Sequence, residues 1–241
     1  MTLLLDNIIA SIIMATILLS LAATQLRVQE AGISQVSSHS AKNKALSFGQ
    51  WLDEDIVSLG ENVIDRSARF ESPDTSSYQV YTIDGSGTRQ ERTITYTTEW
   101  RFYSDRLAGS IKQRKATRYK IIEQPDPLEV ELRDGSTYDR PLFQLERATS
   151  GWKNVDPVTD LATFVDSDFT EDGRSVSTLS LFHIQLVDNN GIPFAAANPV
   201  AADQASFIRV DFTMVPEFEL RRGFLRELYW TTTLKVRPFW G

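Results

Sequence analysis

Residues 2–24, TLLLDNIIASIIMATILLSLAAT, hold a single charged side chain, Asp6. A helix of this length extends roughly 35 Å at 1.5 Å per residue, enough to cross a hydrocarbon core about 30 Å thick. The run is apolar on every side over about six turns, which favours a membrane span over the alternative of a buried core helix. It lacks the basic n-region of a secretory signal peptide and exceeds the length of such a peptide's apolar stretch. We therefore expect residues 1–25 to form a transmembrane helix.

Asp6 is the unusual residue of this segment. A carboxylate costs about 2.5–3.5 kcal/mol at the centre of a bilayer and less near an interface. In one interpretation Asp6 lies at the level of the lipid headgroups, where the positive end of the helix macrodipole favours it. In the other, Asp6 pairs with a cation of a neighbouring chain, such as an α-amino group, so that lateral assembly neutralises it. The residue pattern leaves both interpretations open.

Small side chains recur along the same segment and would let neighbouring helices approach closely. The residues that we expect at such helix contacts are Ala10, Ser11, Ala15, Ser20, Ala22 and Ala23.

The distribution of basic residues bears on orientation. Arg27, Lys42 and Lys44 follow the span and no basic residue precedes it. By the positive-inside rule alone, the C-terminal side would lie in the cytoplasm. A removed basic leader would reverse that asymmetry.

Residues 26–60 are expected to continue the anchor as an amphipathic helix, since the stretch lacks proline and has apolar residues at helical spacing near its end. Gly60 is a plausible C-terminal stop. We expect the acidic residues Asp53, Glu54 and Asp55 to stay near solvent, and an apolar stripe to pack on a globular body. The residues of that stripe that we expect to pack on the head are Phe48, Trp51, Leu52 and Ile56.

Residues 61–241 are expected to form a β-rich head domain. Short runs rich in Thr, Tyr, Val, Ile and Phe indicate strands, and Asp84–Gly87, Asp134-Gly135, Asp172-Gly173 and Asn190-Gly191 indicate hairpin turns between them. The predicted fold class is α+β, with a long N-terminal helix laid on an antiparallel sheet. The runs are YQVYTID, RTITYTTEWRFYS, TRYKIIEQ, PLEVELRD, STLSLFHIQLVD, SFIRVDFTMVP and ELYWTTTLKVRPF.

One strand shows which of its faces is buried. In residues 92–103, RTITYTTEWRFY, apolar or aromatic residues alternate with polar ones. Because successive side chains of a strand point to opposite faces, this alternation predicts one buried and one solvated face. The expected buried set is Ile94, Tyr96, Thr98, Trp100 and Phe102, and the expected solvated set is Thr95, Thr97, Glu99 and Arg101.

Composition excludes several classes of function. The net charge of −7 and the absence of any Lys/Arg block argue against a nucleic-acid partner. The chain has no cysteine, and its two histidines, His39 and His183, lie far apart in sequence. A metal site rich in histidine or a Ser-His-Asp triad would thus rest on one imidazole. No phosphate loop, HExxH, GxSxG or cofactor fingerprint occurs, so we expect a protein that is not an enzyme and has no cofactor.

The nearest approach to a metal site is DSDFTEDG at residues 166–173. The carboxylates of Asp166, Asp168 and Asp172 could hold Ca²⁺, and the alternative is an ordinary acidic loop. The EF-hand pattern fails, because Leu179 occupies the position where the closing glutamate would follow from Asp168.

Several of these features together resemble a type IV pilin or pseudopilin. The chain begins MTLLL, carries a carboxylate at position 6, and joins a long apolar helix to an amphipathic half and a β-sheet head. FGQWLDEDIVSLG at residues 48–60 is similar to the helix end of J-type minor pseudopilins and W-type minor pilins. The strands TITYTTEWRFY, TRYKIIE, SFIRVDFTMVP and TTTLKVRP fit the family's meander more loosely, and the last strand ends Arg237-Pro238 where the family commonly has Arg-Asn.

The resemblance implies a role for the first residues. The family's acidic residue is a glutamate at mature position five, which neutralises the N-terminal amine of an adjacent subunit. Here Asp6 would take that role toward Met1 of a neighbour, and it would become fifth if Met1 were removed before Thr2.

The resemblance also implies a function. The chain would be a structural subunit of a type IV pilus, a secretion pseudopilus or a related surface filament, held in the inner membrane with its head outside the cytoplasm. Its partners would be copies of itself, other pilin-like subunits, the membrane and the assembly machinery. One alternative is a monomeric single-pass membrane-anchored envelope binding domain. A second alternative is an envelope enzyme that uses a pair of carboxylates in one pocket.

Overall fold

The computed structural model describes every residue except 1, 64–68, 195–203, 217–226 and 237–241, and for residues 2–9 it describes the backbone only. The chain divides into two compact units, Met1–Ser40 and Ala41–Gly241. A helix of 57 residues, α1 (Thr2–Ser58), supplies the whole described part of the first unit and the beginning of the second. Gly60 follows with a positive φ of 69°, a conformation that glycine adopts without strain, so the predicted helix stop is confirmed.

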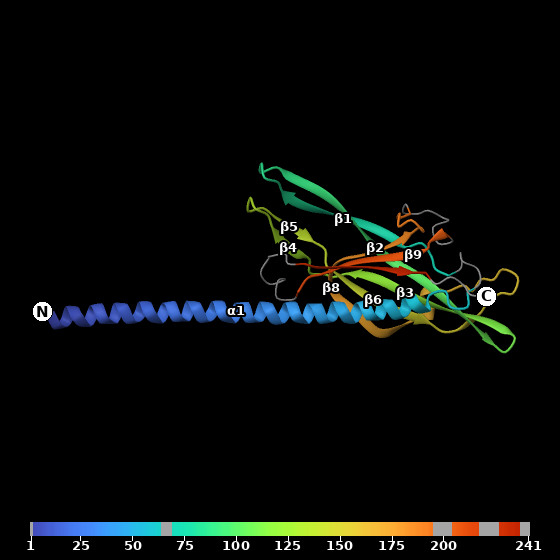
Figure 1. Cartoon of the computed structure of the whole chain (residues 1–241), viewed down its shortest axis with the longest axis horizontal. Helices are drawn as coiled ribbons and strands as arrows, with labels where there is room; N and C mark the ends of the chain where they lie inside the picture. The colour runs from blue at the N-terminus through green and yellow to red at the C-terminus, as the bar shows by residue number, and fades with distance from the viewer. Residues whose placement is uncertain (1, 64–68, 195–203, 217–226, 237–241) are drawn as a thin grey trace. The chain divides into compact units, whose positions relative to one another are not determined.

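The second unit is built on one antiparallel sheet (Figure 1). Its strand order is β1-β2-β3-β6-β8-β9-β10, and a short strand β7 also pairs with β3. A separate two-stranded sheet joins β4 to β5. The fold is therefore α+β, as the sequence predicts. The bounds are β1 (Asp74–Ile83), β2 (Arg89–Ala108), β3 (Ile111–Glu123), β4 (Leu128–Glu131), β5 (Thr137–Arg140), β6 (Phe143–Ser150), β7 (Lys153–Asn154), a 3₁₀ turn η2 (Asp166–Asp168), β8 (Phe169–Val187), β9 (Phe207–Met214) and β10 (Leu228–Lys235).

Strand β8 changes its partner at Leu179. Before that residue β8 pairs with β6, and after it β8 pairs with β9. Thr178 has a positive φ of 63° at the change, and both ladders shift register nearby. Past the change, the Ile184 amide of β8 donates to Thr97 Oγ1 of β2 at 2.9 Å. Thr97 of β2 thus satisfies an amide on an edge of β8 that no longer pairs with β6.

The core lies between the sheet and the last turns of α1. Phe48, Leu52 and Ile56 are at most 3% exposed, and the Phe48 ring meets the Phe212 ring of β9 with 4.8 Å between ring centroids. Trp51 is half-buried at the margin of this core, and its ring lies edge-on to Phe48 at 5.2 Å. Burial of each large apolar side chain contributes about 1.5–3 kcal/mol, so this stripe holds residues 41–58 to the sheet.

Between Ile94 and Phe102, the burial of β2 departs from strict alternation at Thr97. Trp100 and Phe102 are buried as expected, with exposures of 1% and 3%. Thr97, expected on the solvated face, is only 1% exposed. Its hydroxyl accepts the hydrogen bond from the Ile184 amide of β8. Thr97 is buried because this backbone amide, at the edge of a strand, needs an acceptor.

Three of the four predicted turns connect strands or end one, and the fourth is wrong. Asp172-Gly173 lies inside β8, where the pairing with β6 shifts register between Glu146 and Ala148. The positive φ of Gly173, 79°, belongs to this irregularity within a continuous strand. Asp-Gly favours a positive φ in either setting, so the dipeptide alone does not separate a hairpin turn from a bulge.

Candidate functional site

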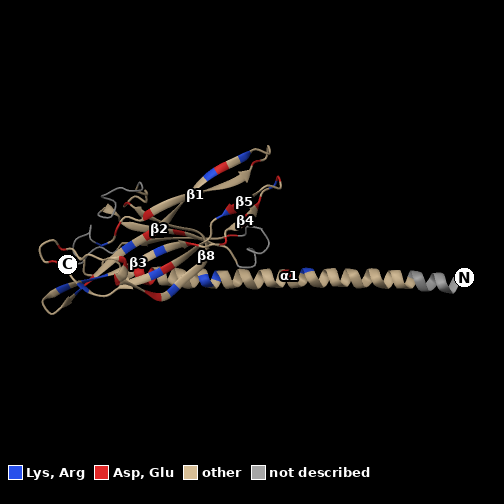
Figure 2. Cartoon of the chain, turned by 180° about the vertical axis from the view of Figure 1, so that it is seen from behind, with Lys and Arg blue, Asp and Glu red and all other residues tan. Residues whose placement is uncertain are grey.

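The first candidate site is the apolar surface of α1. The apolar side chains from Ile12 to Leu21 are between 54% and 71% exposed. Beginning at Ala10, the helix is long and apolar enough to cross a membrane. No charged residue occurs from Ala10 to Leu26, and Figure 2 shows this stretch of α1 in tan, without the blue or red of charged residues. An apolar surface of this extent is far larger than a soluble monomer usually leaves open to water.

Both threonine hydroxyls of this segment are satisfied within the helix. Thr16 Oγ1 donates to the carbonyl of Ile12, and Thr24 Oγ1 donates to the carbonyl of Ser20, each at 2.8 Å. Internal pairing of this kind removes the cost of placing a hydroxyl in hydrocarbon. Few polar groups of this segment would therefore be unsatisfied in the hydrocarbon core of a membrane.

The small residues predicted at helix contacts do not share one face. With about 100° of turn per residue, Ser11, Ala15 and Ala22 fall within about 40° of one another. Ala10, Ser20 and Ala23 point to other sides of the helix, and all six are exposed. The Ser11-Ala15 pair has the small-xxx-small spacing that lets helix backbones approach closely. We call Ser11, Ala15 and Ala22 the small-residue face.

The predicted assembly role of Met1 and Asp6 concerns side chains that the structure does not describe. Met1 is outside the described residues, and for Asp6 only the helical backbone is described.

A buried ion pair ties the end of α1 to the sheet. Arg147 of β6 donates to both carboxylate oxygens of Asp55, with distances of 2.6 and 2.7 Å. The Tyr119 hydroxyl of β3 donates to the same carboxylate, and Arg147 also bonds Asp172 of β8. Burial, and then the negative charge of Asp55, raises the pKa of Tyr119 well above its ordinary value. Two hydrogen bonds from one guanidinium fix geometry as well as charge, so the cluster sets the register of α1 on the sheet.

Asp55 corrects one expectation from the sequence. Asp53 and Glu54 are exposed as predicted, but Asp55 is only 6% exposed. Asp55 lies next to Ile56, on the side of the helix that faces the sheet. A carboxylate is stable there because Arg147 and Tyr119 satisfy its oxygens.

A second buried ion pair fastens a loop to the β2–β3 hairpin. Arg114 donates to both oxygens of Asp105, at 2.7 and 2.9 Å, and these side chains are 3% and 2% exposed. Lys112 bridges Asp105 at 3.1 Å and Asp160 at 2.6 Å. Arg114 also donates to the backbone carbonyl of Asp160 at 3.1 Å. Every charge in this group has an opposite partner, and the group holds the loop after β7 in place.

The three carboxylates proposed for Ca²⁺ are not brought together. Asp166 pairs with Arg118 at 3.0 Å, Asp168 pairs with Lys153 at 2.5 Å, and Asp172 pairs with Arg147. Within the described residues no group of three or more His, Cys, Asp or Glu side chains could hold a metal ion. The sequence showed the spacing of these acids but not the basic residues that strands β3, β6 and β7 bring to each of them.

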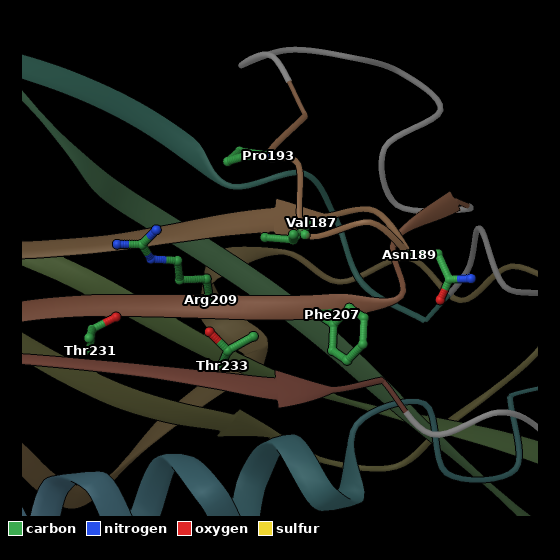
Figure 3. Close-up of a pocket in the computed structure, with 8 residues that line it drawn as sticks. Val187, Asn189, Pro193, Phe207, Arg209, Thr231 and Thr233 are labelled. Carbon is green, nitrogen blue, oxygen red and sulfur yellow. The ribbon is translucent and has the colours of Figure 1, made fainter.

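A pocket of about 550 Å³ opens on the sheet face of β8–β10 that points away from the core (Figure 3). Arg209 of β9 and the threonines Thr231 and Thr233 of β10 supply polar groups, and Phe207 supplies an apolar wall. Among the described residues, the lining includes no carboxylate and no histidine. Arg209 is paired with Asp211 at 3.1 Å, so its charge is partly neutralised. The lining suits a polar ligand better than acid–base chemistry, which needs convergent titratable groups.

His183 lies on β8, the strand that contributes Val187 to this pocket. Its Nδ1 atom is buried and has no hydrogen-bond partner among the described residues. Its cross-strand neighbour is Asp211, which accepts a hydrogen bond from the Tyr229 hydroxyl at 2.7 Å. Burial lowers the pKa of His183, although Asp211 opposes the effect. The imidazole is therefore favoured in its neutral form at this position.

The ion pairs are the feature that sequence reasoning missed. Asp55, Asp105 and Arg114 look like ordinary polar residues in the printed sequence. One signal in the sequence could have found the second pair. Arg114 lies opposite Asp105 in a hairpin whose turn is Gly109-Ser110. Residues of opposite charge at facing positions of a hairpin are expected to pair. The Asp55–Arg147 pair joins residues 92 apart and has no comparable signal.

Comparison of the chain with protein-family models, with curated protein sequences and with solved structures yields no match. Inferences about its function therefore rest on the surfaces and side-chain clusters described above.

Proposed function

We propose that the chain is a pilin-like structural subunit that assembles through its apolar N-terminal helix. The observation that carries this proposal is that one part of α1 is exposed and apolar while another part of it is buried in the head. Its residues from Ile12 to Leu21 expose a continuous apolar surface, whereas Phe48, Leu52 and Ile56 of the same helix are buried under the head's sheet. A head that completes its own core with residues 41–58 does not need the apolar segment for folding. That segment is available for lipid and for other helices.

The proposed role of the segment has two stages. It first anchors the chain in a membrane, because the apolar run matches the thickness of the hydrocarbon core. The resemblance to pilins suggests the inner membrane with the head outside the cytoplasm, the opposite of the orientation that the basic residues alone would give. Neighbouring subunits then pack helix against helix, and the small-residue face lets the backbones approach closely. Helix packing inside a filament would keep the same surface out of water after the subunit leaves the membrane.

Asp6 gives the assembly its selectivity in this proposal. Its carboxylate is costly in hydrocarbon when alone and much less costly beside a cation. The N-terminal amine of an adjacent subunit is the cation that the resemblance suggests. Other pilin-like subunits and the assembly machinery of a pilus or secretion system would be the further partners.

The test uses two full-length variants, Asp6→Ala and Asp6→Glu, each expressed in membranes together with a differently tagged wild-type copy. We expect Asp6→Ala to lose co-purification with the wild-type copy and to be absent from sheared filaments, because the partner's cation is left unpaired. Asp6→Glu keeps the charge and should retain both. Tryptophan emission from the head, which contains Trp100 at 1% exposure, should be the same in both variants.

Normal incorporation of Asp6→Ala would contradict the charge-pairing role. If the wild-type chain itself stays monomeric in membranes, the proposal of filament assembly fails. The alternative of a monomeric anchored binding domain would then be favoured, with the Arg209 pocket as the place to search for its ligand.

A further inference from the structure

The sheet of the head has two edges, and both are open among the described residues. Strand β1 ends the pairing order on one side and β10 ends it on the other. An open strand edge presents unpaired amide and carbonyl groups and can accept a strand from another chain. The hydrogen-bond pattern shows which residues carry those groups.

On β10, the outward-facing residues follow from one bond at its end. The Val236 amide donates to the carbonyl of Ser206, in register with the β9–β10 ladder. In an antiparallel ladder, residues alternate between bonding the partner strand and pointing away from it. The residues that point their backbone groups away from β9 are therefore Tyr229, Thr231, Thr233 and Lys235.

The same reasoning applies to β1. The Asp84 amide donates to the carbonyl of Thr88, in register with the β1–β2 ladder. The residues of β1 that point their backbone groups away from β2 are then Thr75, Ser77, Gln79, Tyr81 and Ile83. At one end, β5 approaches this strand, where Tyr138 meets Tyr81 with ring centroids 5.3 Å apart. The segment from Thr75 to Gln79 remains free of that contact.

Neither edge has the usual protection against pairing. Soluble proteins commonly place Lys, Pro, inward-pointing charges or bulges on exposed edges. Strand β1 has no Lys, Arg or Pro in ten residues, and its one bulge lies at its first residues, between Asp74 and Thr75. Strand β10 has one Lys, at its last position, and no bulge in its ladder with β9. Both strands are rich in Thr, Tyr and other β-forming residues.

We infer that β10 of one subunit pairs antiparallel with β1 of a second copy of this chain. Charge complementarity favours this partner: the only charged residue of β1 is Asp74 and the only one of β10 is Lys235. Antiparallel pairing with Gln79 opposite Thr231 brings these two opposite charges to the same end of the joint ladder. It also aligns Ser77 with Thr233 and Thr75 with Lys235, so that outward-facing groups meet at every second residue.

This pairing is heterologous, since two different edges meet. Each subunit then keeps a free β10 or β1 for the next one, which is the type of contact that continues into an open filament. The inference rests on the proposed function, because it assigns the head-to-head contact of the same assembly. It concerns a different surface from the apolar helix, so the two can fail separately.

Because the chain has no cysteine, any disulfide between two copies must join introduced cysteines. Two full-length variants, Gln79→Cys and Thr231→Cys, are expressed separately and together, and membranes are oxidised. Both positions are exposed. Paired residues in an antiparallel ladder have Cα atoms about 4.5–5.5 Å apart, within the range of a disulfide. We expect a disulfide-linked dimer only when both variants are present.

The other outcomes decide against the inference. A dimer from Thr231→Cys alone would mean that β10 pairs with itself. No dimer from the mixture, while the chain still associates through its helix, would overturn the edge pairing and leave the proposed function standing. A chain that does not associate at all would remove both. In the matched control, Thr95→Cys replaces Gln79→Cys. Thr95 is exposed but lies on β2, inside the β1–β2 ladder, so this control should give no dimer.

A second pair of variants separates backbone pairing from side-chain contact. In the Thr231→Cys chain, Thr233→Pro removes an amide that points away from β9 and leaves the β9–β10 ladder intact. We expect the yield of mixed dimer to fall about tenfold, since a hydrogen bond is lost and the proline ring obstructs the incoming strand. Thr233→Val keeps the amide and should leave the yield within about twofold. Equal losses from both variants would contradict strand pairing.

Discussion

Arg147 of β6 holds Asp55 of α1 through two hydrogen bonds, at 2.6 and 2.7 Å, across 92 residues of sequence. The side chain of Asp55 is 9% exposed, against 6% for the whole residue, and the side chain of Arg147 is 12% exposed. An ion pair in such a site contributes little net stability by itself, because desolvation offsets much of the attraction. Loss of one partner is costly, because it leaves the other charged and buried.

The first prediction follows from that asymmetry. Asp55→Ala should lower the free energy of unfolding by about 3–5 kcal/mol, because Arg147 and the Tyr119 hydroxyl both lose their acceptor. Denaturant unfolding of the detergent-solubilised chain, followed by tryptophan emission, measures the change. Glu54→Ala, at an exposed acid with a 3.8 Å contact to Arg174, is the matched control and should stay within about 0.5 kcal/mol.

Removal of both partners tests the mechanism of that loss. Asp55→Leu combined with Arg147→Met should recover much of the stability lost in Asp55→Ala, because neither member of the buried pair remains charged. Asp172 also loses Arg147, but its side chain is 26% exposed and stays in contact with water. A double variant whose loss of stability equals the sum of the two single-variant losses would show that Asp55 and Arg147 act independently, and would contradict this mechanism.

The second prediction concerns alkaline pH. Burial and Asp55 raise the pKa of Tyr119 above its ordinary value near 10, so folding favours the neutral hydroxyl. The contribution of Tyr119 to stability is therefore complete below about pH 10 and is lost as the pH rises above it. The free energy of unfolding should decrease between about pH 10 and 12, and in Tyr119→Phe it should decrease less steeply, by up to about 1.4 kcal/mol per pH unit. Parallel curves for the two proteins would contradict the assignment.

The third prediction contrasts two glycines of the α1 region. A Cβ on Gly49 would meet the Trp230 ring at 3.9 Å, an ordinary contact, so Gly49→Ala should stabilise the chain by about 0.5–1 kcal/mol through helix propensity. A Cβ on Gly60 would lie 2.7 Å from Arg69 Cδ at a φ of 69°. Gly60→Ala should therefore destabilise the chain by at least about 1–2 kcal/mol. Thermal unfolding of both variants under the same conditions checks the opposite signs.

The fourth prediction concerns the membrane anchor. Leu18→Arg places a charge near the middle of the apolar segment and should weaken insertion by about 2.5–3.5 kcal/mol. Alkaline extraction of membranes measures the released fraction, which should rise strongly. Leu107→Arg is the matched control, because Leu107 is equally apolar and 76% exposed but lies in the head. Equal release of both variants would show that residues 10–26 do not anchor the chain.

The sequence predicted the parts of this fold that depend on local pattern. The long apolar run, the stripe from Phe48 to Ile56 and the stop at Gly60 are all visible as periodicity or as a special backbone residue. Strands such as β2 and β9 were visible because their runs are long and rich in β-forming residues. The bounds of β8 were not, because its first half, FTEDGRS, is polar and pairs only through tertiary context.

The remaining features depend on contacts between distant residues. Strands β5, β6 and β7 escaped prediction, since TYDR and KN carry no strand pattern and FQLERATS alternates only weakly. The burial of Asp55 and of Thr97 depends on partners 92 and 87 residues away. No local rule anticipates such partners, and the same holds for the pocket on β8–β10.

The most direct measurement for the central claim is a disulfide scan of the apolar helix in membranes. Single cysteines are placed at Ala10, Ser11, Ala15, Ser20, Ala22 and Ala23 of the otherwise cysteine-free chain. If the helix mediates assembly as proposed, crosslinked dimers should be concentrated at the small-residue face, Ser11, Ala15 and Ala22, and should diminish when Asp6→Ala is added. No crosslinks at any of the six positions, or equal crosslinks at all of them with no effect of Asp6→Ala, would contradict assembly through this helix.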